Sequence, residues 1–439
     1  MGKSKKNHTL PAAIGLDRFK QALNPYYINS TLRCLGLFIL YLLINPTTSD
    51  AQFIGFEIQN RQRSHSFTFE KHNNLIVVPV VINNRMPAKF ILDSGVRSTI
   101  ITDRSIAEFA GINYDRQITI SGAGRVRDID AYLASNITLT LPGVEGRGQS
   151  LIVLAEDYLE LPYHLGTSVH GIIGYEFFNH FTVMINYENR TITVFEPGTF
   201  RPGRRFSEIP FELLQARPYI YSTMIQSDGS RFKGRFLVDS GASHALLIEA
   251  DSDTLLVKPQ KRFPTIIGRG LGGELEGYFA RLPSLKFDKF RFNDVVVSYT
   301  YDFSDPEMAL ITGRNGSIGG DLLSRFTTVF DYDNRKIYLK KNRSYHEPFE
   351  FNMSGLEVIA KSVEYRTFEV INVMENSPAK RAGVKNGDII LRFNGVAAYD
   401  IALNEILFFF RSRPERMVNL ILLRGDEQIR VRFRLQRIV

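Results

Sequence analysis

The stretch FILDSG at residues 90–95 returns as FLVDSG at residues 236–241, so that Asp93 and Asp239 lie 239 − 93 = 146 residues apart. Both stretches join a hydrophobic run to the same Asp-Ser-Gly turn. Three more matches follow in the same order: SGAG (121–124) with IGRG (267–270), GIIG (171–174) with GSIG (316–319), and FTVMINYENRTITV (181–194) with FTTVFDYDNRKIYL (326–339). Four pairs of matching stretches occur in the same order, and the two members of each pair lie 145 or 146 residues apart. This pattern indicates an internal duplication.

Each copy is rich in alternating apolar residues. LIVVPVVI at 75–82, like the runs before each Asp-Ser-Gly, is bounded by Asn, Asp and Gly and predicts a strand. NYEN at 186–189 and DYDN at 331–334 predict hairpin turns. We therefore expect two mostly β units of roughly 120 to 130 residues each. Helix is expected only as a turn or two, at 176–181 and 321–326.

The two Asp-Ser-Gly turns suggest paired carboxylates. If the copies pack about a pseudo-twofold axis, equivalent residues near that axis meet, and Asp93 would face Asp239. Two carboxyl groups at close range share one proton, so one can act as a base and the other as an acid on a water between them. The flanking residues would support the two loops: Ser94 and Ser240 by hydroxyl hydrogen bonds, Gly95 and Gly241 by permitting a tight turn.

With these motifs the chain resembles the aspartic peptidases of the retroviral-like (retropepsin and pepsin) clan over about residues 75–340. The shared pattern is two hydrophobic residues before Asp-Thr/Ser-Gly, then a glycine-rich flap, then a hydrophobic-Gly loop, and it occurs here twice. The resemblance implies a mainly β fold with two β-barrel lobes, one active site, cleavage of peptide or protein substrates by an activated water, and neither metal nor cofactor. Its flap glycines would be Gly122, Gly124, Gly268 and Gly270.

The sequence departs from the family pattern beside the catalytic loops. Val96 and Ala242 follow the two glycines, and neither offers a hydrogen bond to the outer carboxylate oxygens. Without such donors the pKa values of the pair should be higher, which predicts a mildly acidic to neutral pH optimum. The alternative is a catalytically inactive peptide-binding or scaffold protein, in which Val96 crowds the position of the water.

The last part of the chain resembles a PDZ domain over residues 350–439. SGLEV (354–358), ENSPA (375–379), AGVKNGDII (382–390) and FNG (393–395) follow in the order of that family. Pro378 would begin a short helix, and 402–410 would be a helix ahead of strands at 418–422 and 429–435. The resemblance implies that peptide or protein C-termini bind at the loop of Ser354, Gly355, Leu356 and Glu357. A packing module that only supports the peptidase is the alternative.

The N-terminal region has the pattern of a secretory signal. Basic residues precede an apolar run at 35–44, or 32–44 at most, which is shorter than the about 20 residues that a spanning helix needs. We expect cleavage after Ala51 and an exported protein (periplasmic, cell-envelope or secreted), with an uncleaved membrane anchor as the alternative. Cleavage would remove Cys34, the single cysteine, and with it any disulfide. The expected domains are 1–51, 52–200, 201–343 and 350–439, with a linker at 345–348.

Charge and the remaining motifs argue against other functions. The net charge is 54 − 46 = +8, of which the region before the apolar run carries six basic residues against one acidic, or +5. The folded part is then near +3, without the basic stripe that nucleic-acid binding needs. GRGLGG at 268–273 has the glycine spacing of a dinucleotide-binding motif, but no helix pattern follows it, so we do not expect dinucleotide binding there. No His-Glu-x-x-His spacing suggests zinc.

Overall fold

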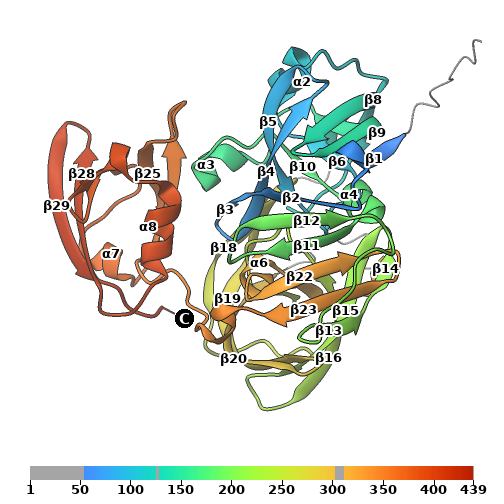
Figure 1. Ribbon diagram of the computed structural model, residues 1–439. Coiled ribbons are helices and arrows are strands. Elements are labelled where there is room, and N and C mark those ends of the chain that lie inside the picture. Colours follow the sequence, from blue (N-terminus) through green and yellow to red (C-terminus); the bar gives the residue numbers. More distant parts are fainter. Residues whose placement is uncertain (1–53, 125–127, 302–310, 439) are drawn as a thin grey trace, which may run out of the picture. The chain divides into compact units, whose positions relative to one another are not determined.

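The computed structural model describes residues 54–124, 128–301 and 311–438. The predicted signal or anchor, with its apolar run at 32–44 and Cys34, lies outside these residues. Within them, no helix has both the length and the apolar character needed to cross a membrane. The fold is mainly β, as predicted, with two peptidase-like lobes and a C-terminal PDZ domain (Figure 1).

The first lobe is built on a nine-stranded sheet. Its main path runs β1-β9-β6-β10-β5-β4-β8-β7, with β3 beside β4. The strands are β1 (Gly55–Ile58), β3 (Glu70–His72), β4 (Leu75–Ile82), β5 (Met86–Leu92), β6 (Thr99–Ile101), β7 (Arg116–Ile120), β8 (Ile129–Leu141), β9 (Val144–Leu154) and β10 (Gly171–Ile173). Strand β4 is apolar throughout because both of its faces are buried: Ile76 and Val78 pack into the main core, and Leu75 and Val77 into a second cluster.

The second lobe repeats this plan on an eight-stranded sheet in the order β14-β15-β16-β21-β17-β20-β19-β18. Its strands are β14 (Glu212–Leu214), β15 (Arg217–Ile225), β16 (Arg231–Val238), β17 (Leu246–Glu249), β18 (Phe263–Gly270), β19 (Gly273–Phe287), β20 (Phe290–Thr300) and β21 (Gly316–Ile318). In both lobes a short strand lies parallel to the one that ends at the Asp: β10 beside β5, and β21 beside β16. The duplication seen in the sequence is therefore also a duplication of strand topology.

A third sheet joins the lobes in the order β13-β23-β22-β11-β12-β2. It consists of β2 (Ser64–Thr68), β11 (Thr182–Asn186), β12 (Thr191–Phe195), β13 (Ser207–Pro210), β22 (Phe326–Asp331) and β23 (Lys336–Lys341). The two predicted hairpins, β11–β12 and β22–β23, are confirmed. They meet where β11 pairs with β22, side by side in Figure 1, and Val183 stands opposite Phe330. One apolar core consequently runs through both lobes.

Helices are short in the described part of the lobes. The expected helical turns are α4 (Tyr175–His180) and α6 (Gly320–Leu323), one behind each hydrophobic-Gly loop. Two more were not predicted, α2 (Arg104–Phe109) and α3 (Leu161–Leu165). The 3-10 turns are η1 (Gln59–Arg61) and η2 (Arg343–His346).

The C-terminal domain has its own sheet and its own core. The strands follow the order β24-β25-β26-β28-β29, with β27 beside β26. Its elements are β24 (Leu356–Lys361), β25 (Thr367–Val373), α7 (Pro378–Arg381), β26 (Ile389–Phe393), β27 (Val396–Ala397), η3 (Ala398–Asp400), α8 (Leu403–Phe410), β28 (Met417–Arg424) and β29 (Glu427–Arg434). As predicted, Pro378 begins α7, where the Ser377 hydroxyl caps the helix by accepting from the Lys380 N–H.

The predicted linker is packed against the second lobe. Tyr345 is buried and its ring lies 5.0 Å from that of Phe292. The Arg325 guanidinium donates to the carbonyls of Glu347 and Pro348 and stacks over the ring of Phe349 at 3.5 Å. A change in composition after residues 341–343 predicted a linker here, but these contacts fix the path of the chain. The domain limits proposed from the sequence stay predictions.

Candidate active site and PDZ groove

The backbone places each candidate aspartate at the end of a buried strand. Asp93 follows β5, and its N–H donates to the carbonyl of Ile173 in β10 at 2.9 Å. Asp239 follows β16, and its N–H donates to the carbonyl of Ile318 in β21, also at 2.9 Å. The parallel strand of each lobe therefore holds the aspartate of that lobe in place.

The serines join the two loops across the lobe boundary. The Ser94 N–H donates to the Ser240 hydroxyl and the Ser240 N–H donates to the Ser94 hydroxyl, each at 3.0 Å. The Ser94 hydroxyl in turn donates to the carbonyl of Val238 at 2.8 Å, and the Ser240 hydroxyl to that of Leu92 at 2.9 Å. Both serines are fully buried. Each of the two hydroxyls therefore accepts one hydrogen bond from the other lobe and donates one to it.

This framework packs the loop of each lobe against the carboxyl group of the other, so that the charges of Asp93 and Asp239 act on each other. The Gly95 N–H donates to Asp93 Oδ1 at 2.6 Å, and the Gly241 N–H donates to Asp239 Oδ1 at 2.9 Å. Burial, together with the adjacent Asp239 charge, raises the pKa of Asp93 well above its ordinary value of 3.8. The pair has the environment in which two carboxyl groups retain one proton.

The glycines are needed because the loops approach each other so closely. A Cβ at Gly95 would lie 2.8 Å from Cγ of Asp239, and one at Gly241 would overlap the carboxyl group of Asp93. Each glycine therefore leaves room for the carboxyl group of the other lobe.

Three polar residues near the pair were not identified as site residues from the sequence. The Tyr332 hydroxyl donates to the Ser94 carbonyl at 3.4 Å, and burial with the nearby Asp93 charge raises the pKa of Tyr332 well above its usual range. The positive charge of Arg217 favours the ionised carboxylate of Asp93 and so acts to lower the pKa of Asp93. His244 contacts the Ser317 hydroxyl through Nε2 at 2.9 Å, and burial lowers the pKa of its ring. Folding brings Tyr332 and Arg217 near Asp93, and no sequence signal marks them. His244 closely follows Asp239 in the sequence, but its position there fits no recognised motif.

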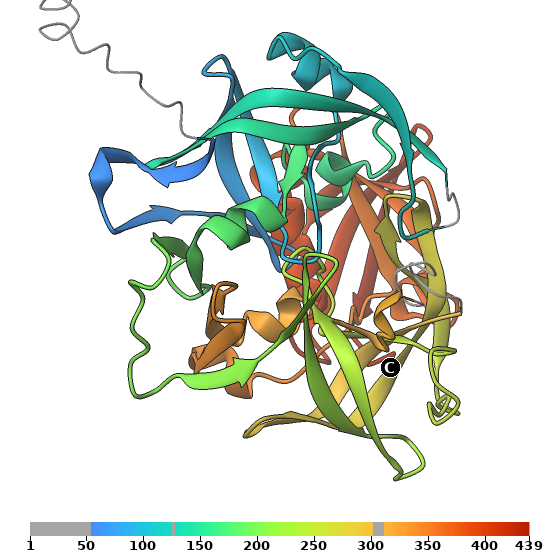
Figure 2. The same ribbon diagram turned by 90° about the vertical axis from the view of Figure 1, so that its right-hand side faces the viewer.

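Two glycine-rich tips, teal and yellow in Figure 2, meet each other. The Gly272 N–H donates to the Ala123 carbonyl at 2.8 Å, and Gly124 forms a β-bridge with Gly272. Among the predicted flap glycines, Gly122, Gly124 and Gly270 lie at this contact. Gly268 does not, since it lies on β18 at a bulge with open space around its Cα.

The tip of the second flap also contacts apolar residues of the first lobe. Leu271 packs against a cluster that includes Leu75 and Val77, and against a second one that includes Ile129. Val96, which follows the first Asp-Ser-Gly, packs against the first of these clusters. The first lobe therefore presents an apolar wall beside Asp93.

The loop expected to bind carboxylates in the PDZ domain has its donors engaged internally. The N–H groups of Ser354 and Gly355 donate to Asn352 Oδ1 at 3.0 and 3.3 Å, and the Leu356 N–H donates to the Ser354 hydroxyl at 3.0 Å. Glu357 points away from this loop into a cavity, and burial raises the pKa of its side chain. Among the described strands, β24 pairs with β25 alone, so its other edge has no strand partner there.

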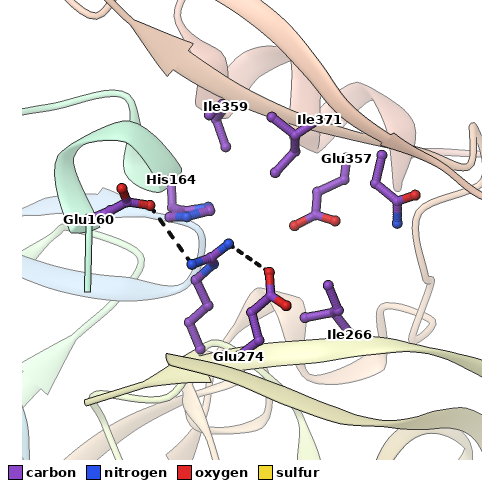
Figure 3. Close-up of a pocket in the computed structure, with 9 residues that line it drawn as sticks. Glu160, His164, Ile266, Glu274, Glu357, Ile359 and Ile371 are labelled. Carbon is purple, nitrogen blue, oxygen red and sulfur yellow. Dashed lines mark hydrogen bonds and ion pairs between the residues drawn. The ribbon is translucent and has the colours of Figure 1, made fainter. Parts of the chain in front are cut away.

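A cavity of about 450 Å³ lies between the PDZ sheet and the peptidase lobes. Figure 3 shows Glu160 and His164 reaching it from the first lobe, Ile266 and Glu274 from the flap hairpin of the second, and Glu357 from the PDZ domain. Arg269 lines the same cavity and pairs with Glu274 at 2.9 Å and with Glu160 at 3.8 Å. Burial, with the charges of Arg269 and Lys361, lowers the pKa of His164 to about 4, so its ring is neutral at pH 7.

Comparisons with known protein families agree with this architecture. The aspartyl protease family model matches the chain twice, at residues 78–177 and 224–322, and a PDZ domain model matches residues 369–424. No curated protein matches the chain. The chain therefore consists of two duplicated lobes of the aspartyl protease family followed by a C-terminal PDZ domain.

Proposed function

We propose that this protein is an exported aspartic endopeptidase whose PDZ domain binds peptide or protein segments, C-termini among them, at β24. The observation that carries the proposal is the close packing of the two Asp-Ser-Gly loops, which places Asp93 and Asp239 where the charge of one acts on the other. Support for export comes from the basic N-terminal region and its short apolar run. An uncleaved membrane anchor stays the alternative for that segment.

In the proposed reaction Asp93, the more buried of the two, carries the proton that the pair shares, and Asp239 acts as the base. A water between the carboxyl groups gives a proton to Asp239 as its oxygen attacks the peptide carbonyl carbon. Asp93 gives its proton to the carbonyl oxygen, which yields a neutral gem-diol. Collapse of the gem-diol returns a proton to Asp93, and Asp239 passes its proton to the leaving nitrogen. The carbon–nitrogen bond breaks, and the pair again holds one proton.

The test replaces each aspartate by its isostere, Asp93→Asn and Asp239→Asn, and assays the full chain against a peptide library. Each variant should lose at least about 1,000-fold in kcat/KM, because the remaining carboxyl group cannot serve as both acid and base. Asp288→Asn, at an exposed hairpin turn of the second lobe, is the matched control and should retain activity. Wild type that cleaves no peptide would favour the inactive peptide-binding protein, and either variant cleaving as an active wild type does would contradict the role of the Asp93–Asp239 pair.

A further inference from the structure

Helix α3 of the first lobe lies on the PDZ domain at its peptide groove. It contacts β24, and the ring of Tyr163 meets that of Tyr365 at 6.2 Å. Gly166, which ends the helix, comes so close to α8 that a Cβ there would lie 2.7 Å from Cβ of Leu403. Strand β24 and helix α8 are the two walls between which a PDZ domain receives an added strand. The segment 161–166 therefore touches both walls of the groove.

A second contact fixes α8 to the same lobe. The Asn404 side chain accepts a hydrogen bond from the Asn73 N–H at 3.3 Å and donates one to the Lys71 carbonyl at 3.5 Å. Both partners belong to the hairpin of β3 and β4, Lys71 on β3 and Asn73 in the turn. Strand β4 pairs with β5, which Asp93 follows. The beginning of α8 is thus held between this hairpin and Gly166.

The other end of α3 reaches the flap. Glu160 precedes the helix in the left-handed backbone region and forms the 3.8 Å ion pair with Arg269. Arg269 lies on β18 two residues before Leu271, the residue at the flap tip that packs on the first lobe. Figure 3 shows this ion pair as the dashed line that leaves Glu160. The flap and the PDZ groove therefore share α3 as a common neighbour.

We propose that α3 is a latch: a polypeptide that adds as a strand to β24 displaces α3 from the groove, and the flap is thereby freed to open. The partner that fits is an extended segment, because the edge of β24 that has no strand partner among the described residues offers backbone hydrogen bonds once α3 has left the groove. The proposal rests on the proposed peptidase activity and on peptide binding by the PDZ domain. A partly exposed ion pair is weak, so the latch is reversible rather than a permanent clamp.

The test weakens the latch without any added ligand. Tyr163→Ala removes the contact with Tyr365, and Asn404→Ala removes both hydrogen bonds to the β3–β4 hairpin. In the full chain carrying both changes, amide hydrogen exchange should become at least about threefold faster in β24 and in the flap hairpin at 263–277. Because an easier opening admits substrate, kcat/KM should rise about threefold or more. Tyr399→Ala, at an exposed PDZ tyrosine, is the matched control and should change none of these values.

Each other outcome overturns the latch. Faster exchange in β24 with unchanged exchange in the flap would show that α3 covers the groove without controlling the flap. Unchanged exchange in β24 would show that α3 does not cover the groove. Repeating the exchange measurement in an Asp93→Asn background keeps the result independent of catalysis. Lack of cleavage by wild type would therefore count against the proposed activity, while the exchange data would still decide on the latch.

Discussion

The carboxyl groups of Asp93 and Asp239 lie in a space that two glycines leave open. Gly241 shows the constraint most clearly, because any side chain there would occupy the volume of the Asp93 carboxyl group. Asp93 cannot move away without losing either its hydrogen bond from Gly95 or its contact with Asp239. The geometry of the pair is therefore set by backbone packing around it as much as by the aspartates.

Gly241→Ala should consequently abolish most activity while the fold survives. A displacement of about 1 Å at a reacting group can cost 100-fold in rate, so we expect kcat/KM to fall at least about 100-fold. Circular dichroism should remain that of wild type. The control is Gly203→Ala, where an added Cβ meets no atom within 4 Å. Retention of full activity by Gly241→Ala would contradict the close packing of the two loops.

The raised pKa of Asp93 predicts how activity and stability vary with pH. Burial and the Asp239 charge keep the proton on Asp93 above its ordinary pKa of 3.8. The shared proton is then lost only at higher pH, and the pH–rate profile should peak in the mildly acidic to neutral range. A peak near about pH 3 would contradict this expectation.

The raised pKa of Asp93 also makes the stability of the fold depend on pH. Native Asp93 binds its proton more tightly than unfolded Asp93 does, so its contribution to the free energy of unfolding is fully present below the unfolded pKa. That contribution declines as pH rises through the native value. Denaturant titrations of wild type should show this loss, and Asp93→Asn should remove it. An equal pH dependence in the variant would assign the effect to other groups.

Among single residues, the sequence could identify those that recur in both copies of the repeat. The duplicated Asp-Ser-Gly turns identify Asp93, Asp239 and their neighbours, since equivalent residues of two copies meet at a pseudo-twofold axis. Tyr332 and Arg217 follow no such rule. Tyr332 reaches the Ser94 carbonyl of the other lobe because β22, the strand just before it, pairs with β11. Arg217 lies on β15 of the second lobe and acts on Asp93 of the first. Neither position carries a sequence signal of these contacts between the lobes.

Single elements differ in how far their sequences determine them. The long strands β4, β16 and β19 carry apolar patterns that predict them directly. Helix α3 has only five residues, including a proline and two aromatic rings, and no helical periodicity. Its conformation depends on the contacts that it makes with the PDZ domain, so its sequence alone could not predict it.

The PDZ loop is an element whose function depends on one side chain. Asn352 accepts from two of the three N–H groups that a bound carboxylate would need. In wild type we therefore expect free-acid and amidated decapeptide libraries to bind within about threefold of each other, since the loop donors are already satisfied.

Asn352→Ala should free those donors. The PDZ domain should lose about 1 to 3 kcal/mol of stability, because buried N–H groups lose their acceptor, and it should gain preference for the free-acid library. Fluorescence anisotropy of the two libraries on the full chain measures that preference. Asn386→Ala, at an exposed PDZ turn, is the control. A strong preference for free acids in wild type would show that a carboxylate displaces Asn352 unaided.

For the whole molecule, the decisive feature is the sheet that joins the lobes. Its pairing of β11 with β22 unites strands about 145 residues apart, and the core of each lobe continues into the other. The sequence predicted both hairpins correctly but not their pairing with each other, because register between distant strands depends on packing that no local pattern records. The PDZ core is separate from this one.

Phe330→Ala tests the division into two cooperative units. Phe330 is fully buried on β22, opposite Val183 and 5.2 Å from the ring of Phe178. Its truncation should lower the free energy of unfolding by about 3 to 5 kcal/mol through lost burial and a cavity. Phe330 belongs to the core of the lobes and not to the PDZ core. The substitution should therefore lower the stability of the lobes and leave that of the PDZ domain unchanged.

Calorimetry of the full chain would reveal whether that expectation holds. Wild type should show one transition for the two lobes together and another for the PDZ domain, and Phe330→Ala should shift only the first to lower temperature. Phe408→Ala, at a PDZ phenylalanine that is 74% exposed, should change stability by no more than about 0.5 kcal/mol. If Phe330→Ala instead split the lobe transition in two, the lobes would be independent domains. The active site would then depend on their docking rather than on one shared core.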